Sequence, residues 1–185
     1  LREKFSEVFN DENDLLKFTQ FILTRCFLVV VSTPNQESAF RVFSVMNSRG
    51  LDLLPTDIIK SMTIGKLPKD EEQKYTEKWE ELENLTGRDG FNEVFTHTRT
   101  IFAKERPKKN LLDEFKEYVI KQTSPKSLVD EYLIPYTEAY VCLKNCDFSS
   151  TQNAEEINEL LLWLNKTNNH DWMPPAIKFL TDHKN

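Results

Sequence analysis

Histidine and cysteine are the residues most able to bind a metal or act as a nucleophile, and their spacing here favours neither role. No histidine lies in an HExxH pattern, and no two cysteines form a CxxC pair. We therefore predict a solvated His97 on the polar flank of its helix, and buried thiols that pack as small apolar groups. The six residues are His97, His170, His183, Cys26, Cys142 and Cys146.

A basic cluster is a candidate for a phosphate contact, since the sequence holds neither a GxGxxG nor a GxxxxGKS/T loop. Four of its residues surround Pro107, which predicts a loop, and Arg99 lies upstream on a predicted helix. Positive loops at helix ends favour contact with a polyanion such as DNA. The alternative is a solvated loop between helices, which the formal net charge of −6 favours. The cluster comprises Arg99, Lys104, Arg106, Lys108 and Lys109.

The elements that position these residues are predicted to be helices. Apolar residues recur at intervals of three and four, the period of an amphipathic helix, most clearly from Phe91 to Phe102. Glu114 has the spacing of a solvated helix face, and Pro135 is expected to kink its helix. Further helical stripes cover 15–26, 39–46, 75–82, 112–119, 128–143 and 157–164. The four glycines, Gly87 among them, fall at breaks in this periodicity. The predicted fold class is mainly α, an irregular helical bundle with at most one short strand near residues 27–31.

The strand candidate is the β-branched run from Phe27 to Val31, which is followed by Ser-Thr-Pro-Asn. One strand cannot form a sheet by itself. It therefore either pairs with sequence outside this chain or continues the preceding helix.

Length and composition indicate a globular protein. Its 185 residues, of which 39% are hydrophobic and 11% aromatic, can bury a core without disulfides or metal. No apolar run reaches the ~18 residues of a membrane helix, and three cysteines form no even disulfide framework, which indicates a reducing, cytoplasmic setting. We expect one compact unit with two segments: a strand and helical hairpin over residues 1–65, and a helical bundle over residues 66–185.

Residues 39–65 carry the most informative pattern. They predict a helix that ends near Asn47, a tight turn at Gly50, and a second helix that begins near Pro55. At this corner Arg49 presents a planar guanidinium suited to an anion, and its alternative role is to cap the carbonyls of the first helix. Lys60 faces a similar choice between an anion partner and a solvated helix face.

A family resemblance rests on the run Ala39-x-x-x-Phe43-x-x-x-Asn47-Ser48-Arg49-Gly50, continued by Leu54, Asp57 and Lys60. It resembles the signature of the ParB/sulfiredoxin-like N-terminal domain of GmrSD-type restriction proteins, many of which are known only by a domain of unknown function. The resemblance implies a bacterial defence protein. In that family a nucleotide-hydrolysing N-terminal domain senses modified foreign DNA, and a C-terminal His-Me finger nuclease cuts it.

Both catalytic motifs of that family are missing from this chain. The Asp-Gly-Gln-Gln-Arg run of nucleotide hydrolysis does not occur, and the tail from Thr181 to Asn185 lacks the nuclease pattern. The resemblance therefore implies a non-catalytic helical fragment of a larger restriction protein, which supports the sensor site and links it to the nuclease. The fragment is expected to hold no metal and no cofactor, whereas the parent would use an NTP and a divalent metal.

The resemblance also implies where contacts lie. Nucleotide or DNA contacts are expected at Asn47, Arg49, Gly50 and Lys60, and the expected partners are the other domains of the parent protein and DNA. An alternative of a different class is a stand-alone helical module that docks a partner protein. It predicts neither nucleotide nor DNA binding, and an exposed aromatic stripe at Tyr132, Tyr136 and Tyr140.

Overall fold

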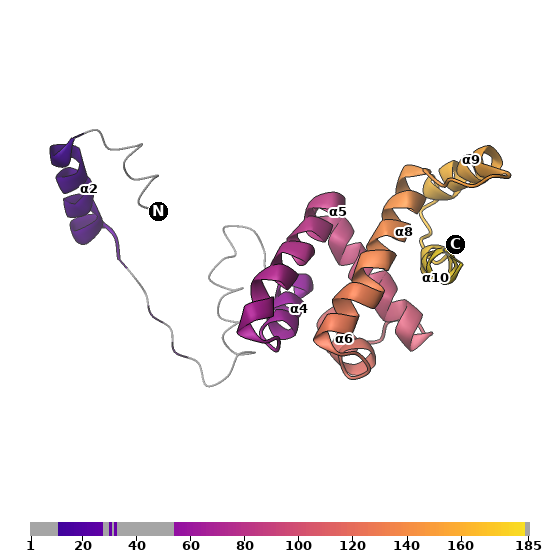
Figure 1. The fold of residues 1–185 in the computed structure, drawn as a ribbon, viewed down its shortest axis with the longest axis horizontal. Helices are drawn as coiled ribbons and strands as arrows, with labels where there is room; N and C mark the ends of the chain where they lie inside the picture. The colour runs from indigo at the N-terminus through magenta and orange to yellow at the C-terminus, as the bar shows by residue number, and fades with distance from the viewer. Residues whose placement is uncertain (1–10, 28–29, 31, 33–53, 184–185) are drawn as a thin grey trace. The chain divides into compact units, whose positions relative to one another are not determined.

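The computed structural model describes residues 11–27, 30, 32 and 54–183 (Figure 1). The chain divides into two compact units, residues 1–46 and residues 47–185. This division lies earlier than the boundary expected near residue 65, because helix α4 (Pro55–Ile64) packs against the helix that follows it. The described residues form helices and contain no strand, which confirms the mainly α fold class.

The described part of the first unit is helix α2 (Glu12–Arg25). Asp11 caps its N-terminus, since the carboxylate accepts a hydrogen bond from the Asn13 N–H group at 3.2 Å. Cys26 is exposed after the last turn, so the prediction of a buried thiol is wrong there. Phe27 and Val30 belong to no helix or strand. The other residues of the predicted 27–31 strand, and the whole predicted helix 39–46, lie outside the described residues.

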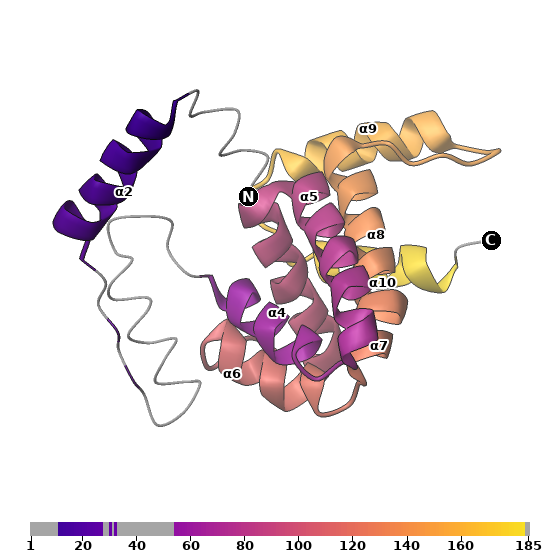
Figure 2. The ribbon, with the colours of Figure 1, turned by 60° about the vertical axis from the view of Figure 1, so that its left-hand side comes forward.

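Helix α5 (Lys69–Ala103) consists of two limbs that fold back on each other. In a straight helix Trp79 would lie about 18 Å from Phe91 and about 24 Å from Phe95. Its ring centroid instead lies 5.6 Å from that of Phe91 and 5.3 Å from that of Phe95. The chain reverses at Gly87, whose φ of 70° and ψ of 165° are not helical, and the limbs lie side by side in Figure 2. Few L-residues adopt this φ, so the break predicted at Gly87 is confirmed.

A second long helical segment contains a π-helical turn. Helix α7 (Pro125–Ser127) continues through the π-helical turn η2 (Leu128–Leu133) into α8 (Ile134–Asn145), in which Pro135 lies in the first turn. Proline has no N–H group and its ring crowds the preceding turn, so the wider π turn accommodates it. The remaining elements are α6 (Leu111–Phe115), the π-helical turn η1 (Lys116–Ile120), α9 (Ala154–Asn165) and α10 (Met173–Asp182).

The core of the second unit is aromatic at its centre. Phe95 is fully buried, and its ring centroid lies 5.1 Å from that of Phe91 and 4.9 Å from that of Phe115. These contacts join both limbs of α5 to α6. Aliphatic side chains from the surrounding helices complete the core: Ile59, Val94, Val119, Leu128, Val129, Leu133, Leu143, Met173 and Ile177.

Helix α8 packs between α5 and α10, and this packing buries Tyr136 and Tyr140. Tyr136 and Tyr140 are only 4% and 6% exposed, and Tyr132 is half-buried. The predicted exposed stripe is therefore wrong, because Tyr136 and Tyr140 are buried on α8, and Tyr132, in the preceding η2, is partly covered. The Tyr140 hydroxyl donates a hydrogen bond to Glu93 Oε2 at 2.7 Å. Burial and the Glu93 carboxylate together raise the pKa of Tyr140.

His97 is buried rather than solvated, which overturns the sequence prediction. It lies on the second limb of α5, where its ring centroid is 6.0 Å from that of Tyr140 on α8. Burial lowers the pKa of His97 to about 4, and the positive charges of His170 and Lys144 act in the same direction. The Glu93 carboxylate opposes this shift without cancelling it.

The buried imidazole predicts a loss of stability in mild acid. The unfolded chain binds a proton at His97 near the ordinary pKa of 6.5, whereas the folded protein binds it only near 4. As far as His97 is concerned, the free energy of unfolding should therefore be highest above pH 6.5 and should fall as the pH drops from 6.5 towards 4. Urea unfolding of wild type and His97→Gln across pH 7.5 to 4.5 measures this effect. We expect a smaller fall for the variant, and parallel pH profiles would contradict the assignment.

Candidate functional site

The predicted corner of the signature is only partly visible. Asn47, Arg49 and Gly50 lie outside the described residues, so their nucleotide or DNA contacts stay predictions. Lys60 lies on α4, and its ammonium nitrogen is 3.0 Å from Oε1 of Glu80 on the first limb of α5. Lys60 therefore has an anionic partner within the protein.

Asp57, a second residue of the signature, caps the N-terminus of α4. Its Oδ2 atom accepts a hydrogen bond from the Leu54 N–H group at 2.8 Å, which satisfies one of the free donors at the helix N-terminus. The same atom lies 2.6 Å from Nη2 of Arg88 on the second limb of α5. Asp57 and Lys60 thus connect α4 to the two limbs of the α5 hairpin.

Arg99 is a buried structural residue. Its side chain is 1% exposed, and Nε lies 2.6 Å from Oε2 of Glu114 on α6. The guanidinium also donates to the backbone carbonyls of Glu105 and Arg106, and it lies over the Tyr118 ring. With its charge paired with Glu114 and both Nη atoms donating inside the protein, Arg99 is separated from the exposed side chains of the basic cluster.

Glu114 organises the loop that carries the rest of the cluster. Its Oε1 atom accepts hydrogen bonds from the N–H groups of Lys108 at 2.7 Å and Lys109 at 2.9 Å. Burial alone would raise the pKa of Glu114, but these two hydrogen bonds and the Arg99 charge hold it below its ordinary value. The prediction of a solvated Glu114 is wrong, because the periodicity of a helix does not reveal that the 104–110 loop folds over it.

The exposed members of the cluster have acidic neighbours. Lys108 pairs with Glu105 at 2.7 Å, and Lys109 pairs with Glu117 at 2.9 Å. Arg106 lies 3.7 Å from Asp171. Lys104 has a left-handed backbone conformation and ends α5. Among the described residues, its side chain forms no hydrogen bond or ion pair. The predicted polyanion contact stays a prediction, and these pairs reduce the positive charge available for it.

A hollow of about 550 Å³ lies beside Lys104, where α5, η2, α8 and α10 meet. Its walls include the aromatic rings of Phe102 and Tyr132, whose centroids are 4.9 Å apart. Burial, with help from the charge of Asp182, raises the pKa of Tyr136 in the same wall to about 12. The hollow also has both signs of charge in its lining, because the ammonium of Lys178 pairs with Asp182.

A second hollow, of about 590 Å³, lies between α8, the loop that precedes α9, and α10. Cys142 lies in its wall, and burial raises the pKa of this half-buried thiol, which disfavours the reactive thiolate. The Cys142 thiol points to the carbonyl of Asp147 at 3.4 Å. A nucleophilic role gains no support from this environment.

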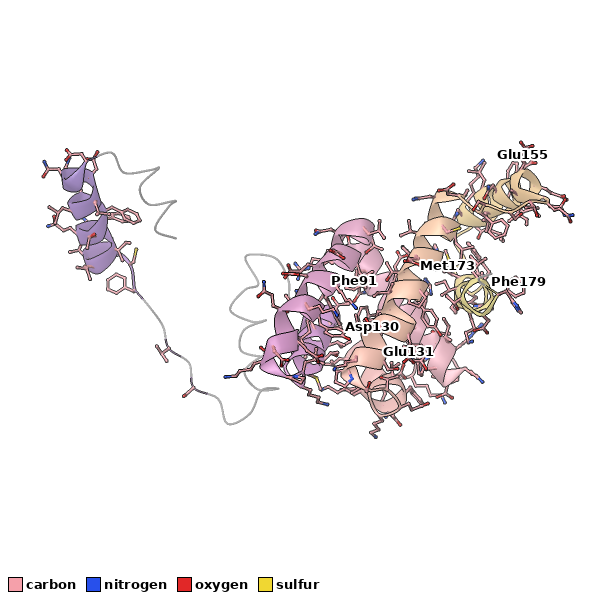
Figure 3. The ribbon with its side chains drawn as sticks, viewed as in Figure 1. Phe91, Asp130, Glu131, Glu155, Met173 and Phe179 are labelled. Atoms are coloured by element: carbon pink, nitrogen blue, oxygen red, sulfur yellow. The ribbon has the colours of Figure 1, made fainter. Side chains whose placement is uncertain are left out.

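A contact at Asp130, which is labelled in Figure 3, joins the first limb of α5 to η2. The Tyr75 hydroxyl donates a hydrogen bond to Asp130 Oδ2 at 2.7 Å, and Lys78 pairs with the other oxygen. The hydrogen bond to Asp130, together with burial, raises the pKa of Tyr75 to about 12. This pKa shift of Tyr75 therefore results from the packing of α5 against η2.

Within the described residues, no group of three or more His, Cys, Asp or Glu side chains is arranged to hold a metal ion. No helix in this part of the chain is both long and apolar enough to cross a membrane.

The exposed apolar side chains of α9 were not predicted from the sequence. Leu160, Leu162 and Trp163 are about half exposed, although they belong to one folded helix. The signal was present in the sequence, because five consecutive apolar residues from Leu160 to Leu164 exceed what one buried face of a helix can hold.

No protein-family model, curated protein or solved structure matches this chain.

Proposed function

We propose that this chain is the non-catalytic helical part of a GmrSD-like, nucleotide-dependent restriction protein of the bacterial cytoplasm. It would support the site that senses modified DNA and link that site to a nuclease. Its partners would be the other domains of the same protein and DNA. The NTP and the divalent metal would be bound by those other domains.

The observation that supports this proposal is the attachment of the signature to the helical unit. Asp57 and Lys60 both belong to the signature, and each makes an ion pair with a different limb of the α5 hairpin. A ligand-induced shift of the corner that precedes α4 would therefore either carry the hairpin with it or break these pairs. The two side chains supply the physical connection that a linking function needs.

The experiment is nucleotide-stimulated cleavage of modified and unmodified phage DNA by the full-length protein. Arg49→Ala and Asn47→Ala should each reduce nucleotide stimulation about 10- to 100-fold, because each removes a hydrogen bond to a charged group. Asp57→Asn should weaken stimulation while nucleotide binding persists, since it removes the charge that pairs with Arg88. Lys121→Ala, at an exposed residue of the same unit, is the control.

Two results would contradict the proposal. A full-length protein that neither binds nucleotide nor cuts DNA would exclude the restriction function. Stimulation that survives both corner substitutions would place the sensor site elsewhere.

A second candidate function is a stand-alone helical module that binds a partner protein. The exposed apolar side chains of α9 favour it, because contiguous apolar surface of this kind marks interaction sites. This candidate predicts no nucleotide binding and no effect of Arg49→Ala. The cleavage experiment therefore separates the two functions.

A further inference from the structure

Helix α9 is apolar on a side that the rest of the unit leaves uncovered. Leu160 is 56% exposed and Trp163 is 58% exposed, whereas Leu161 between them is buried. Leu164 lies at the edge of the same surface with 38% of its area exposed. Leu160, Trp163 and Leu164 are spaced by three and four residues, so they share one face of the helix. We refer to these three side chains as the α9 stripe.

The orientation of α9 is set by contacts on its opposite side. The Asn158 side-chain amide accepts a hydrogen bond from the Phe148 N–H group and donates one to its carbonyl oxygen, at 2.8 and 2.9 Å. The Asn165 amide donates to the Leu143 carbonyl at the end of α8, at 2.8 Å. With Leu161, these two side chains turn one face of α9 inward. Rotation that would hide the α9 stripe would break these contacts.

Charge is distributed unevenly along the same helix. Three carboxylates lie in its first half, at Glu155, Glu156 and Glu159, and Glu155 marks that end of α9 in Figure 3. The positive residue at the other end is Lys166, whose ammonium lies 4.4 Å from the centroid of the Trp163 ring. The apolar stripe therefore runs between an acidic end and a basic end.

We propose that the α9 stripe pairs with the α9 stripe of a second copy of this chain, with the two helices antiparallel about a two-fold axis. In such an isologous contact Leu160 of each copy lies opposite Trp163 of the other. The acidic first turn of each helix then lies beside Lys166 of the other. A parallel pairing would instead place the carboxylates of both copies together, which is unfavourable.

Self-complementarity is the reason to choose a second copy as the occupant. The stripe supplies both members of each apolar contact, and the helix supplies both members of each charge pair. Three apolar side chains per copy form a small interface, so the dimer should be weak and its population should depend on concentration. The inference goes beyond the proposed function and does not depend on it, since pairing is measured without nucleotide or DNA.

The first test is the mass of the chain in solution, measured by sedimentation velocity across a wide concentration range. Wild type should shift from monomer to dimer as concentration rises. Trp163→Glu should raise the dissociation constant by about 30-fold or more, because a central tryptophan dominates such contacts. Leu85→Glu, at a 55% exposed leucine on α5, is the matched control and should leave the equilibrium unchanged. Circular dichroism checks that both variants remain helical.

A charge exchange tests the antiparallel arrangement and does not require Trp163 to be changed. Glu156→Lys alone and Lys166→Glu alone should each weaken self-association, since every charge pair becomes repulsive. An equimolar mixture of the two variants should form a heterodimer, because both pairs are then complementary. A parallel dimer would also favour the mixture, but each variant alone would then self-associate about as strongly as wild type, because like charges already face each other in a parallel wild-type pair.

The inference would be overturned if wild type stayed monomeric at every concentration, or if Trp163→Glu associated as strongly as Leu85→Glu. The exposed face of α9 would then serve a different protein or another part of a longer chain. Failure of the dimer would leave the cleavage experiment unaffected, so the two proposals can fail separately.

Discussion

Replacing Phe95 with alanine should lower the free energy of unfolding by about 3–5 kcal/mol, enough to remove a large share of the stability of an ordinary domain. Phe95 is fully buried, and its ring contacts Trp79, Phe91 and Phe115 at centroid distances of 5.3, 5.1 and 4.9 Å. The substitution would remove apolar contacts and leave a cavity at the point where both limbs of α5 meet α6. The surrounding rings are held on three different helical segments and cannot all move inward to fill it.

Urea unfolding followed by circular dichroism measures this effect. Phe179→Ala is the matched control, because Phe179 is the same residue type but is 63% exposed on α10, where Figure 3 labels it. The control should change the free energy of unfolding by less than about 0.5 kcal/mol. Equal losses for the two variants would show that the aromatic cluster does not form the centre of the core.

Replacing Arg99 with alanine should cost about 3–5 kcal/mol of unfolding free energy, because it leaves a buried partner charge without compensation. It would also remove the donors that hold the carbonyls of Glu105 and Arg106. The 104–110 loop depends on this guanidinium on one side and on Glu114 on the other. We therefore expect the loop to become susceptible to proteolysis in the same variant.

A double-mutant cycle separates loss of the pair from loss of packing. Glu114→Leu alone should be strongly destabilising, since the Lys108 and Lys109 N–H groups lose their acceptor. Arg99→Met combined with Glu114→Leu should be more stable than the sum of the single losses predicts, because no charge is then left buried alone. Additive losses would contradict an ion pair between these residues. Arg106→Ala, which removes a 92% exposed side chain, is the control.

Much of the helical architecture could be predicted from periodicity. The apolar stripe from Phe91 to Phe102 has the spacing of a helix, and it is helical with Phe91, Val94 and Phe95 buried. Gly87 was expected to mark a break, and its positive φ marks the reversal of α5. Pro135 was expected to disturb its helix, and a π-helical turn precedes it. Each of these features follows from the conformational preferences of a few neighbouring residues.

The candidate site was less predictable, because its residues are brought together over long separations. Periodicity placed His97 and Glu114 on polar helix faces, but α8 covers the first and the 104–110 loop covers the second. Tyr132, Tyr136 and Tyr140 were expected to form an exposed surface, yet Tyr136 and Tyr140 are buried on α8, which packs between α5 and α10. In the described part of the second unit, an exposed apolar surface lies on α9 instead, where the inward face is occupied by two asparagines and Leu161.

The sequence by itself determined the class of the fold, the positions of most helices and the break at Gly87, because these depend on local spacing and backbone preference. Only the tertiary structure decided which polar side chains are buried and which apolar side chains are left exposed. A helix of polar and apolar residues has two or more faces that another element could cover. The sequence of that helix alone does not indicate which face is covered or by which element. Arg99 became a buried partner of Glu114, and Trp163 became an exposed side chain, because of what packs beside each of them.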